Sequence, residues 1–389
     1  MSLLSDYEQR TVWKYEPING RFHTHDGLTQ KVSPDGNCIL FPGSTVVFRA
    51  GGTCCQMIQL LQSVLYNKLE DTGMLASLLP VSTIHMTLHD LVSPEQYPYM
   101  PGIEYMQKLN ESLNRADEIV EEIRQEYAGT KITMVSDRIV NMLSKSLVML
   151  LKPATEADYQ VLMKLYTRFD AVEKLPYHWI PHITLAYFKP GMLDGDRLGR
   201  VVDDVQIAPE NALSFDFYTE GLTAQYFLDM QTYKDVPERL CFCCDGGLDR
   251  SVMAANILNH MAGNRNLPVT GEARSDWPDG GVHPVSKQVW TTLERHGIVP
   301  DRTCSAASSL REEEISHFSN FVAISDRAIE RFSWLQLPET RVYTVSHFFY
   351  GVQDPEYGEI SYEEAFCDIT NRVRRYLDFF ANEWRMMSA

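Results

Sequence analysis

The chain has no long hydrophobic run. Its 389 residues are 44% hydrophobic and 22% charged, a balance typical of soluble globular proteins rather than of disordered ones. The longest apolar stretches are far shorter than the roughly 20 residues that span a bilayer. The opening MSLLSDYEQRTVWKYEP contains acidic residues and no apolar core, so we expect no secretory leader, a cytoplasmic location and no membrane partner.

Positive charge is also scarce. The sequence has 35 Lys and Arg against 52 Asp and Glu, which gives a formal net charge of −17. Proteins that bind long nucleic acids present a basic face to the phosphates, so a broad duplex-binding surface is not expected. A small nucleotide or the end-group of a nucleic acid is a better match as substrate.

A cysteine framework is missing as well. The eight Cys include two adjacent pairs, and no spacing is typical of a zinc site. We therefore expect free thiols in a reducing compartment, most of them buried as small hydrophobic residues. No carboxylate-rich cluster indicates a metal, so neither a metal nor another cofactor is expected.

The chain is too long for one ordinary core, and its pattern changes near residues 232–238. Residues 1–235 show an approximately repeated order of strand, helix and strand, which suggests an internal duplication. In residues 236–389 strands alternate with helices, which favours a parallel, doubly wound α/β sheet. We expect RLCFCC, NFVAIS and RVYTVSHF to be strands of that sheet.

One tetrapeptide pattern occurs twice in the first region, as His85-Met86-Thr87-Leu88 and as His182-Ile183-Thr184-Leu185. Residues i and i+2 of a strand project from the same face. His85 and Thr87 therefore point one way and their apolar neighbours point into a core, and the second copy behaves alike. Two such strands side by side would bring two imidazoles and two hydroxyls into one cleft.

That set of groups suits phosphodiester cleavage. A neutral His takes the proton of the attacking oxygen, and a charged His donates a proton to the leaving oxygen. The Thr hydroxyls donate hydrogen bonds to the non-bridging oxygens. A single strand His is more often a satisfied core residue, and the repetition is what favours catalysis. We expect the flanking His89 and His178 to be structural.

The twin motifs resemble those of the 2H phosphoesterase superfamily, which includes RNA 2′,3′-cyclic phosphodiesterases and ADP-ribose cyclic phosphate hydrolases. The stretch SPDGNCILFPGSTVVFRA is similar to an uncharacterised branch in which Pro-Gly-x-Thr opens a strand. Over residues 20–230 the resemblance implies a bilobal α+β fold of two antiparallel sheets with a pseudo-twofold, the motifs on central strands. It also implies that His85, Thr87, His182 and Thr184 are catalytic, with Tyr187 lining a base or sugar subsite.

A second motif occurs in CCDGGLDRS, where Cys244 stands six positions before Arg250 and Ser251 follows. The loop joins an apolar strand to a helix, so its backbone N–H groups can cradle a phosphate. The Arg can bind two phosphoryl oxygens, and the thiolate can attack phosphorus. Asp354, before Pro355, is the candidate general acid.

This half resembles low-molecular-weight protein tyrosine phosphatases and the related arsenate reductases over residues 238–385. The resemblance implies that Cys244, Arg250 and Asp354 are catalytic. The loop residues would bind phosphate: Asp245, Gly246, Gly247, Leu248, Asp249 and Ser251. The family usually has Asn at the position of Gly247 and often Cys at that of Asp249. Asp245 and Asp249 bring negative charge to the loop, or else point outward. Cys243 should face the strand's core.

These observations predict a bifunctional phosphoesterase. The histidine site would open a cyclic phosphodiester, and the cysteine site could then remove the resulting monoester. In one alternative the second domain acts independently on a phosphoprotein. In another it is a degenerate phosphate-binding domain that regulates the first.

Overall fold

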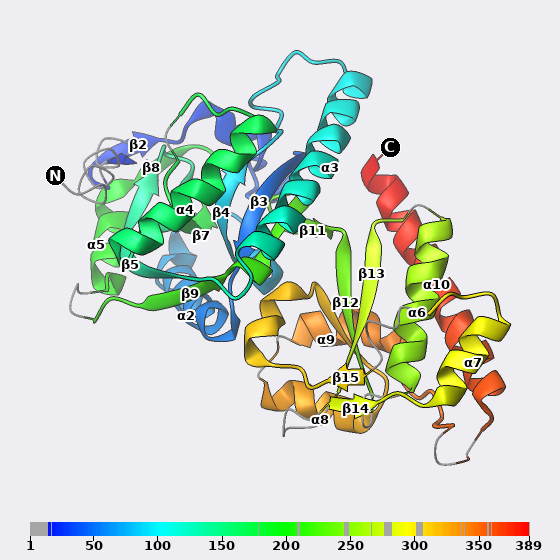
Figure 1. Ribbon diagram of the computed structural model, residues 1–389. Helices are drawn as coiled ribbons and strands as arrows, with labels where there is room; N and C mark the ends of the chain where they lie inside the picture. The colour runs from blue at the N-terminus through cyan, green and yellow to red at the C-terminus, as the bar shows by residue number, and fades with distance from the viewer. Residues whose placement is uncertain are drawn as a thin grey trace. The chain divides into compact units, whose positions relative to one another are not determined.

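The computed structural model describes residues 15–16, 18–177, 179–207, 211–244, 249–265, 267–275, 282–300, 306–335, 337, 339–355, 358 and 360–388. Its internal contacts divide the chain into two compact units, Met1–Lys234 and Asp235–Ala389. Both units combine helices and strands (Figure 1). None of the helices in the described ranges is long and apolar enough to cross a membrane.

The first unit is built on two sheets, with strand orders β1-β5-β6-β7, in which β9 also pairs with β5, and β11-β10-β3-β4. The first sheet contains β1 (Tyr15–Glu16), β5 (Lys131–Met142), β6 (Ser146–Pro153), β7 (His182–Tyr187) and β9 (Ser214–Tyr218). The second contains β3 (Gly43–Arg49), β4 (His85–Asp90), β10 (Leu222–Asp229) and β11 (Thr232–Val236). A small separate pair joins β2 (Arg21–His23) and β8 (Met192–Asp194).

Helices pack against both sheets. The α-helices of this unit are α2 (Gly52–Leu69), α3 (Gly102–Glu126), α4 (Glu156–Arg168) and α5 (Gly195–Val205). α3 lies along β3 and β10, and α4 lies against β5 and β6 (Figure 1). Thr155 begins α4 as its sequence suggests, because its Oγ1 accepts a hydrogen bond from the backbone N–H of Asp158 at 3.1 Å.

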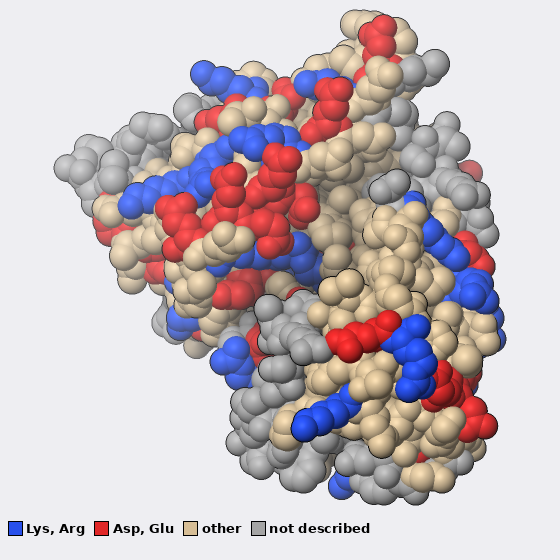
Figure 2. All heavy atoms as spheres, turned by 45° about the vertical axis from the view of Figure 1, so that its right-hand side comes forward, with Lys and Arg blue, Asp and Glu red and all other residues tan. Residues whose placement is uncertain are grey.

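Charged side chains of both signs are interleaved on the helices of this unit (Figure 2). Arg168 at the end of α4 pairs with Glu122 at 2.6 Å and with Glu126 at 2.5 Å, both on α3. These exposed ion pairs contribute little stability individually. They place opposite charges side by side, so the basic groups of α4 do not form a continuous positive surface there.

One order of elements occurs twice in the first unit. β3, α2 and β4 form the first copy, and β6, α4 and β7 form the second. β4 pairs antiparallel with β3 so that His85 lies opposite Arg49, and β7 pairs antiparallel with β6 so that His182 lies opposite Leu150. The approximate repeat expected from the sequence is therefore present as a repeat of strand order and of strand register.

The second unit contains a parallel sheet of order β13-β12-β16. Its strands are β12 (Glu238–Cys244), β13 (Val269–Ser275) and β16 (Asn320–Ala323), and β14 (Val282–Pro284) pairs separately with β15 (Ala306–Ser308). Its helices are α6 (Arg250–Asn264), α7 (Lys287–Arg295), α8 (Asp326–Trp334), α9 (Glu339–Phe349) and α10 (Tyr362–Ser388). A 3-10 helix spans Glu312–His317.

Strand β12 separates two hydrophobic layers. Leu240, Phe242 and Cys244 pack in one layer with residues of α6, α7 and α10. Cys241 and Cys243 pack in the other with residues of α8 and β16. The alternation follows from the two-residue period of a strand, and helices cover both faces of the sheet. Cys243 thus faces a core, opposite to Cys244, as we expect from its register.

One expected strand of this unit is wrong. RVYTVSHF, residues 341–348, belongs to α9. Its valines favour a strand, but Val342, Val345, Ser346 and Phe349 are the buried positions. Their spacing of three, four and seven residues is that of a helix face. Packing of that face against β16 overrides the local preference.

Candidate active site

A pocket in the first unit contains both copies of the repeated motif. Its lining residues are Leu79, Thr83, His85, Thr87, His182, Thr184, Tyr187, Met230 and Tyr233. The pocket is narrow, with a free volume of about 20 Å³, which is room for about one water molecule. The four residues expected to be catalytic are therefore brought to one place.

The two motif strands meet because each is an edge strand of its sheet, β4 in one sheet and β7 in the other. This corrects the expectation of central strands, since a strand with a free side can face a strand of another sheet. The indole N–H of Trp179, three residues before β7, donates to the backbone oxygen of Thr87 at 2.9 Å. That bond ties the two motif strands together across the gap between their sheets.

The alternation of strand side chains determines which groups reach the pocket. β4 and β7 share one burial pattern along their six residues, with the His and the Thr half-buried and the residues between and after them buried. Met86 and Ile183 are completely inaccessible to solvent. The polar groups therefore face the pocket while the apolar residues anchor each strand in a core.

Each motif strand also contains a β-bulge at the same position. The register shifts just after the threonine, which leaves Leu88 in β4 and Leu185 in β7 as the extra residues. Such a bulge redirects the side chains that follow it. Tyr187 is five residues after His182, an odd step that would place it on the opposite face of a regular strand. Because of the bulge, it lines the same pocket.

The two histidines have different surroundings. The Nδ1 atom of His182 lies 2.8 Å from the backbone oxygen of Ile180. A carbonyl only accepts, so we assign the Nδ1–H as donor, which leaves Nε2 with a lone pair in the neutral ring. The ring of His85 packs against Tyr233 with centroids 5.0 Å apart and planes inclined at 60°.

An aromatic wall closes one side of the pocket. The hydroxyl of Tyr187 points at the sulfur of Met230 at 3.0 Å, and that of Tyr233 lies 3.9 Å from it. Burial raises the pKa of both tyrosines, so both stay neutral at physiological pH. Met230 and Tyr233 come from the β10–β11 hairpin, which is far from either motif in the sequence. No local signal in the sequence indicates that they belong to the site.

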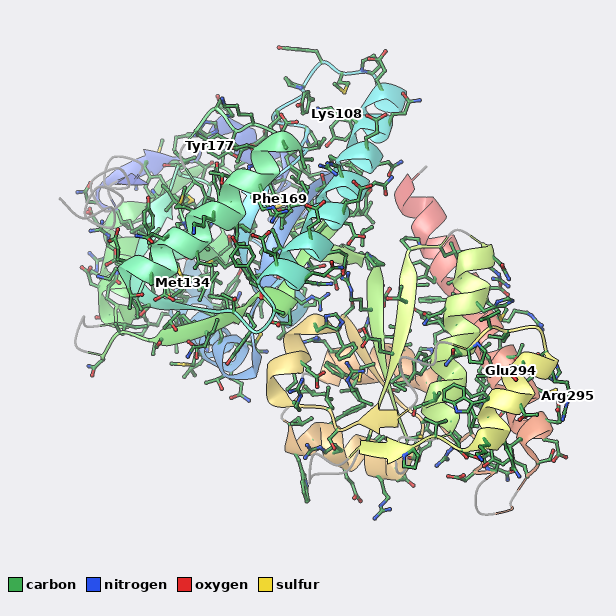
Figure 3. The ribbon with its side chains drawn as sticks, in the orientation of Figure 1. Lys108, Met134, Phe169, Tyr177, Glu294 and Arg295 are labelled. Carbon is green, nitrogen blue, oxygen red and sulfur yellow. The ribbon has the colours of Figure 1, made fainter. Side chains whose placement is uncertain are left out.

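The flanking residues have structural contacts. His89 is fully buried, its ring lies 4.8 Å from that of Tyr166, and its Nε2 is 3.4 Å from the Oδ1 of Asp170. It packs against helix α4, as expected for a structural residue. Tyr177 lies in the loop before β7 (Figure 3) and donates its hydroxyl to Asp90 at 2.7 Å. His178 lies outside the described residues.

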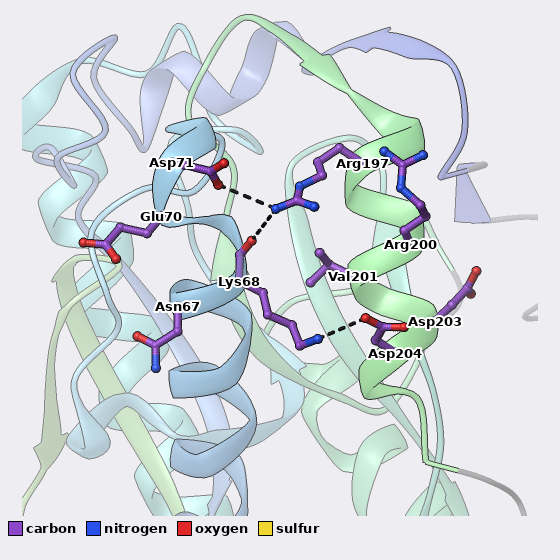
Figure 4. Close-up of a pocket in the computed structure, with 9 residues that line it drawn as sticks. All are labelled: Asn67, Lys68, Glu70, Asp71, Arg197, Arg200, Val201, Asp203 and Asp204. Carbon is purple, nitrogen blue, oxygen red and sulfur yellow. Dashed lines mark hydrogen bonds and ion pairs between the residues drawn. The ribbon is translucent and has the colours of Figure 1, made fainter.

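A wider groove of about 880 Å³ lies between α2 and α5 (Figure 4). Charged side chains of both helices and of the 3-10 helix Glu70–Thr72 line it, and ion pairs join several of them. Lys68 pairs with Asp204 at 3.0 Å, and Arg197 pairs with Asp71 at 3.7 Å. The groove combines mutually neutralising charges, and none of the candidate catalytic residues is among its lining residues. None of the described residues form a cluster of metal-ligating side chains.

In the second unit, Cys244 ends β12 and α6 begins six residues later. The backbone N–H of Ser251 lies 3.4 Å from the sulfur of Cys244, and the Ser251 hydroxyl lies 3.3 Å from it. Burial raises the pKa of the Cys244 thiol, while the charge of Arg250 and the hydrogen bonds from Ser251 act in the opposite direction. The donors are thus placed to stabilise a thiolate, but burial favours the thiol.

Arg250 and Asp354 meet directly. The Nη2 of Arg250 lies 2.6 Å from the Oδ2 of Asp354, and its Nη1 donates to the backbone oxygen of Val352 at 2.7 Å. Both side chains are buried. The structure therefore brings the predicted phosphate-binding cation and the predicted general acid together at the end of β12 and the start of α6.

The carboxylate of Asp249 is held by residues outside the loop. Its carboxylate accepts hydrogen bonds from the backbone N–H of Ser286 at 3.2 Å and from the hydroxyl of Tyr362. It is buried, at 4% exposure, and points toward α7 and α10. The starts of α7 and α10 supply the hydrogen-bond donors for this buried carboxylate. The donors of a phosphate loop are instead directed at the phosphate. The other four expected loop ligands, Asp245, Gly246, Gly247 and Leu248, lie outside the described residues.

Comparison with known proteins found no matching family model and no matching curated protein. Solved structures of phosphatases match part of the chain. YfkJ from Bacillus subtilis is 19% identical over 38% of this chain and 96% of its own, with a TM-score of 0.34. A low-molecular-weight protein tyrosine phosphatase from T. tengcongensis is 22% identical over 36% and 98%, with a TM-score of 0.32. The YwlE arginine phosphatase from Geobacillus stearothermophilus is 25% identical over 38% and 95%, with a TM-score of 0.31.

Proposed function

We propose that the first unit hydrolyses a cyclic phosphodiester by acid–base catalysis with two histidines. The observation that supports this is the single pocket lined by His85, Thr87, His182 and Thr184. The substrate class is an RNA 2′,3′-cyclic phosphate or a cyclic ADP-ribose phosphate. The proposed chemistry uses only side chains of the chain itself.

The surroundings of the two rings suggest which histidine is the general base and which is the general acid. The Nε2 of His182 takes a proton from water, because its Nδ1–H is directed to the Ile180 carbonyl. The water oxygen attacks phosphorus, and one phosphorus–oxygen bond of the cyclic ester breaks. The leaving oxygen takes a proton from His85, which lines the same pocket on the other motif strand. The product is a phosphomonoester with a free hydroxyl next to it.

The two threonines have a different role. Negative charge on the non-bridging oxygens increases as water adds to phosphorus. Hydroxyls of Thr87 and Thr184, on the same faces as the histidines, are placed to donate hydrogen bonds to those oxygens. Loss of one such donor costs about 10²- to 10³-fold in turnover in other hydrolases.

A second reaction is favoured by the contacts of Cys244. The backbone N–H of Ser251 donates to its sulfur, the thiol itself donates to the Ser251 hydroxyl oxygen, and Arg250 and Asp354 lie together nearby. We propose that the Cys244 thiolate attacks a phosphomonoester, that Asp354 protonates the departing oxygen, and that water then releases phosphate from the sulfur while Asp354 takes its proton. In this proposal the incoming phosphoryl group shares Arg250 with Asp354.

The product of the first reaction belongs to the substrate class of the second. The favoured hypothesis is therefore sequential processing of one end-group by the two units. An independent activity on a phosphoprotein is the alternative for the second unit, since tyrosine and arginine phosphatases are among the similar structures. A regulatory phosphate-binding role is the other, because burial favours the neutral thiol of Cys244.

The first reaction is tested by incubating the purified chain, with EDTA present, with 2′,3′-cyclic nucleotides and with cyclic ADP-ribose phosphate. We expect ring opening by the wild type, and a loss of about 10²- to 10⁴-fold for His85→Ala and for His182→Ala. His260→Ala, on α6 of the second unit, is the matched control and should keep full activity. Full activity of either pocket variant would refute the proposal.

The second reaction is tested by the fate of the monoester. Wild-type protein should convert the cyclic substrate to free phosphate, whereas Cys244→Ser should accumulate the monoester. If Cys244→Ser releases phosphate at the wild-type rate, the cysteine mechanism is wrong. If the wild type stops at the nucleoside monoester but hydrolyses a phosphopeptide, the two units act on separate substrates.

A further inference from the structure

Three helices of the second unit begin at one buried carboxylate. Asp249 directly precedes the first residue of α6. Its Oδ1 accepts from the backbone N–H of Ser286, which caps α7, and its Oδ2 accepts from the hydroxyl of Tyr362, the first residue of α10. The same Tyr362 oxygen lies 3.3 Å from the Ser286 hydroxyl.

Helix starts carry positive partial charge and unpaired N–H donors. A carboxylate at such a junction is stabilised without occupying a lysine or arginine side chain. Burial still raises the pKa of Asp249, while the hydrogen bonds from Tyr362 and Ser286 lower it. Keeping the Asp249 carboxylate ionised therefore costs free energy, which its hydrogen bonds with Tyr362 and Ser286 offset in part.

The contacts of Asp249 and of its neighbour Arg250 reach the same stretch of chain. Arg250 binds Val352 and Asp354, near the beginning of the connection from α9 to α10. Asp249 binds Tyr362, at the end of that connection. Two consecutive residues thus hold the connection on both sides of Asp354.

We propose that Asp249 is a positioning residue, which acts through Tyr362 to hold Asp354 where it protonates the leaving oxygen. This role rests on the phosphatase reaction proposed for the second unit. It explains why an acidic residue stands next to the phosphate-binding arginine. The carboxylate is engaged by Ser286 and Tyr362 rather than by the arginine beside it.

The test is the dependence of kcat/KM on the leaving group. A series of aryl phosphates is used, from 2,4-dinitrophenyl phosphate, which needs no acid, to phenyl phosphate, which does. The constant kcat/KM is chosen because it reports the attack step. We expect Asp249→Asn and Tyr362→Phe to lower kcat/KM for phenyl phosphate by about 10-fold or more, with less than about 3-fold change for the dinitrophenyl ester. Asp354→Asn should show the same selective loss.

A matched control is Tyr350→Phe, which removes another tyrosine–aspartate hydrogen bond of this unit, with Asp326. It should leave the whole series unchanged. Equal losses across the series for Asp249→Asn and Tyr362→Phe would show a merely structural role and overturn the positioning proposal. If the wild type hydrolyses none of the esters, the proposed phosphatase reaction itself is wrong. Tyr362→Phe keeps the test decisive should Asp249→Asn fail to fold.

Discussion

Gly43 begins β3, and we expect its replacement by Ala to disturb the histidine pocket from a distance. A Cβ at this position would lie 2.4 Å from Cζ of Phe227 and 2.6 Å from the backbone oxygen of Val92. The Val92 oxygen accepts a hydrogen bond from the backbone N–H of Ser44 at 2.8 Å, which holds it in place. Because the Val92 oxygen belongs to the backbone, the start of β3 as well as the phenyl ring must move.

The size of the effect follows from these contacts. Non-bonded carbon atoms pack at about 3.5–4.0 Å, so the Phe227 ring must shift by about 1 Å. Overpacking of this kind costs about 1–3 kcal/mol of unfolding free energy. Phe227 packs on Tyr233 with ring centroids 5.2 Å apart, and Tyr233 packs on His85 at 5.0 Å. A misplacement of about 1 Å at a catalytic group can reduce turnover up to about 100-fold.

The assay combines urea unfolding, followed by circular dichroism, with turnover of a 2′,3′-cyclic nucleotide. The control is Gly102→Ala at the start of α3, where a Cβ meets no atom within 4 Å. It should unfold like the wild type or at slightly higher urea. If Gly43→Ala unfolds at the same urea concentration as the wild type and keeps its turnover, the inferred path from Gly43 to His85 does not exist.

Three further results are expected. Thr184→Val should lower kcat on the cyclic substrate by about 10²-fold with little change in KM, and steady-state kinetics that show an unchanged kcat would contradict the role of its hydroxyl. Cys244→Ser should abolish phosphomonoester hydrolysis in a colorimetric phosphate assay, whereas Cys243→Ser should retain it, because the two side chains face opposite layers. Burial alone would raise the pKa of Glu272, but the hydrogen bonds and charges of His317 and Arg274 together outweigh it and lower the pKa from the ordinary 4.5 to about 2. The free energy that the ionised Glu272 contributes to folding is therefore present above pH 4.5 and is lost as pH falls toward 2. Because this carboxylate is about a third exposed, we expect Glu272→Gln to lower the free energy of unfolding by about 1 kcal/mol at pH 7 and by less at pH 3. An equal loss at both pH values in urea titrations would refute this.

Much of the first site could be anticipated because it depends on local pattern. Alternation along a strand places His and Thr on one face, and this holds for β4 and β7. Tyr187 shows the limit of that rule. Its odd spacing from His182 contradicts a regular strand, and only the register shift opposite β6 brings it into the pocket. A bulge depends on the partner strand, which local sequence does not specify.

The second site shows the same division. The strand, the loop and the helix start around Cys244 follow from an apolar run that ends in a Gly-rich stretch. The destination of the Asp249 carboxylate does not, because its donors Ser286 and Tyr362 lie 37 and 113 residues away. Helix α9 could not be predicted for a related reason. Its β-branched residues favour a strand, and only tertiary packing selects the helix.

By itself, the sequence determined which groups are available for chemistry and which face of each element carries them, because side-chain alternation and helix periodicity are properties of a few neighbouring residues. Only the tertiary structure decided that both His-x-Thr strands are edge strands which meet at one pocket, that the β10–β11 hairpin completes its wall, and that Asp249 joins three helix starts. These arrangements depend on the packing and hydrogen bonding of segments more than a hundred residues apart, and the sequence of one segment alone does not determine the free energy of its contacts with another.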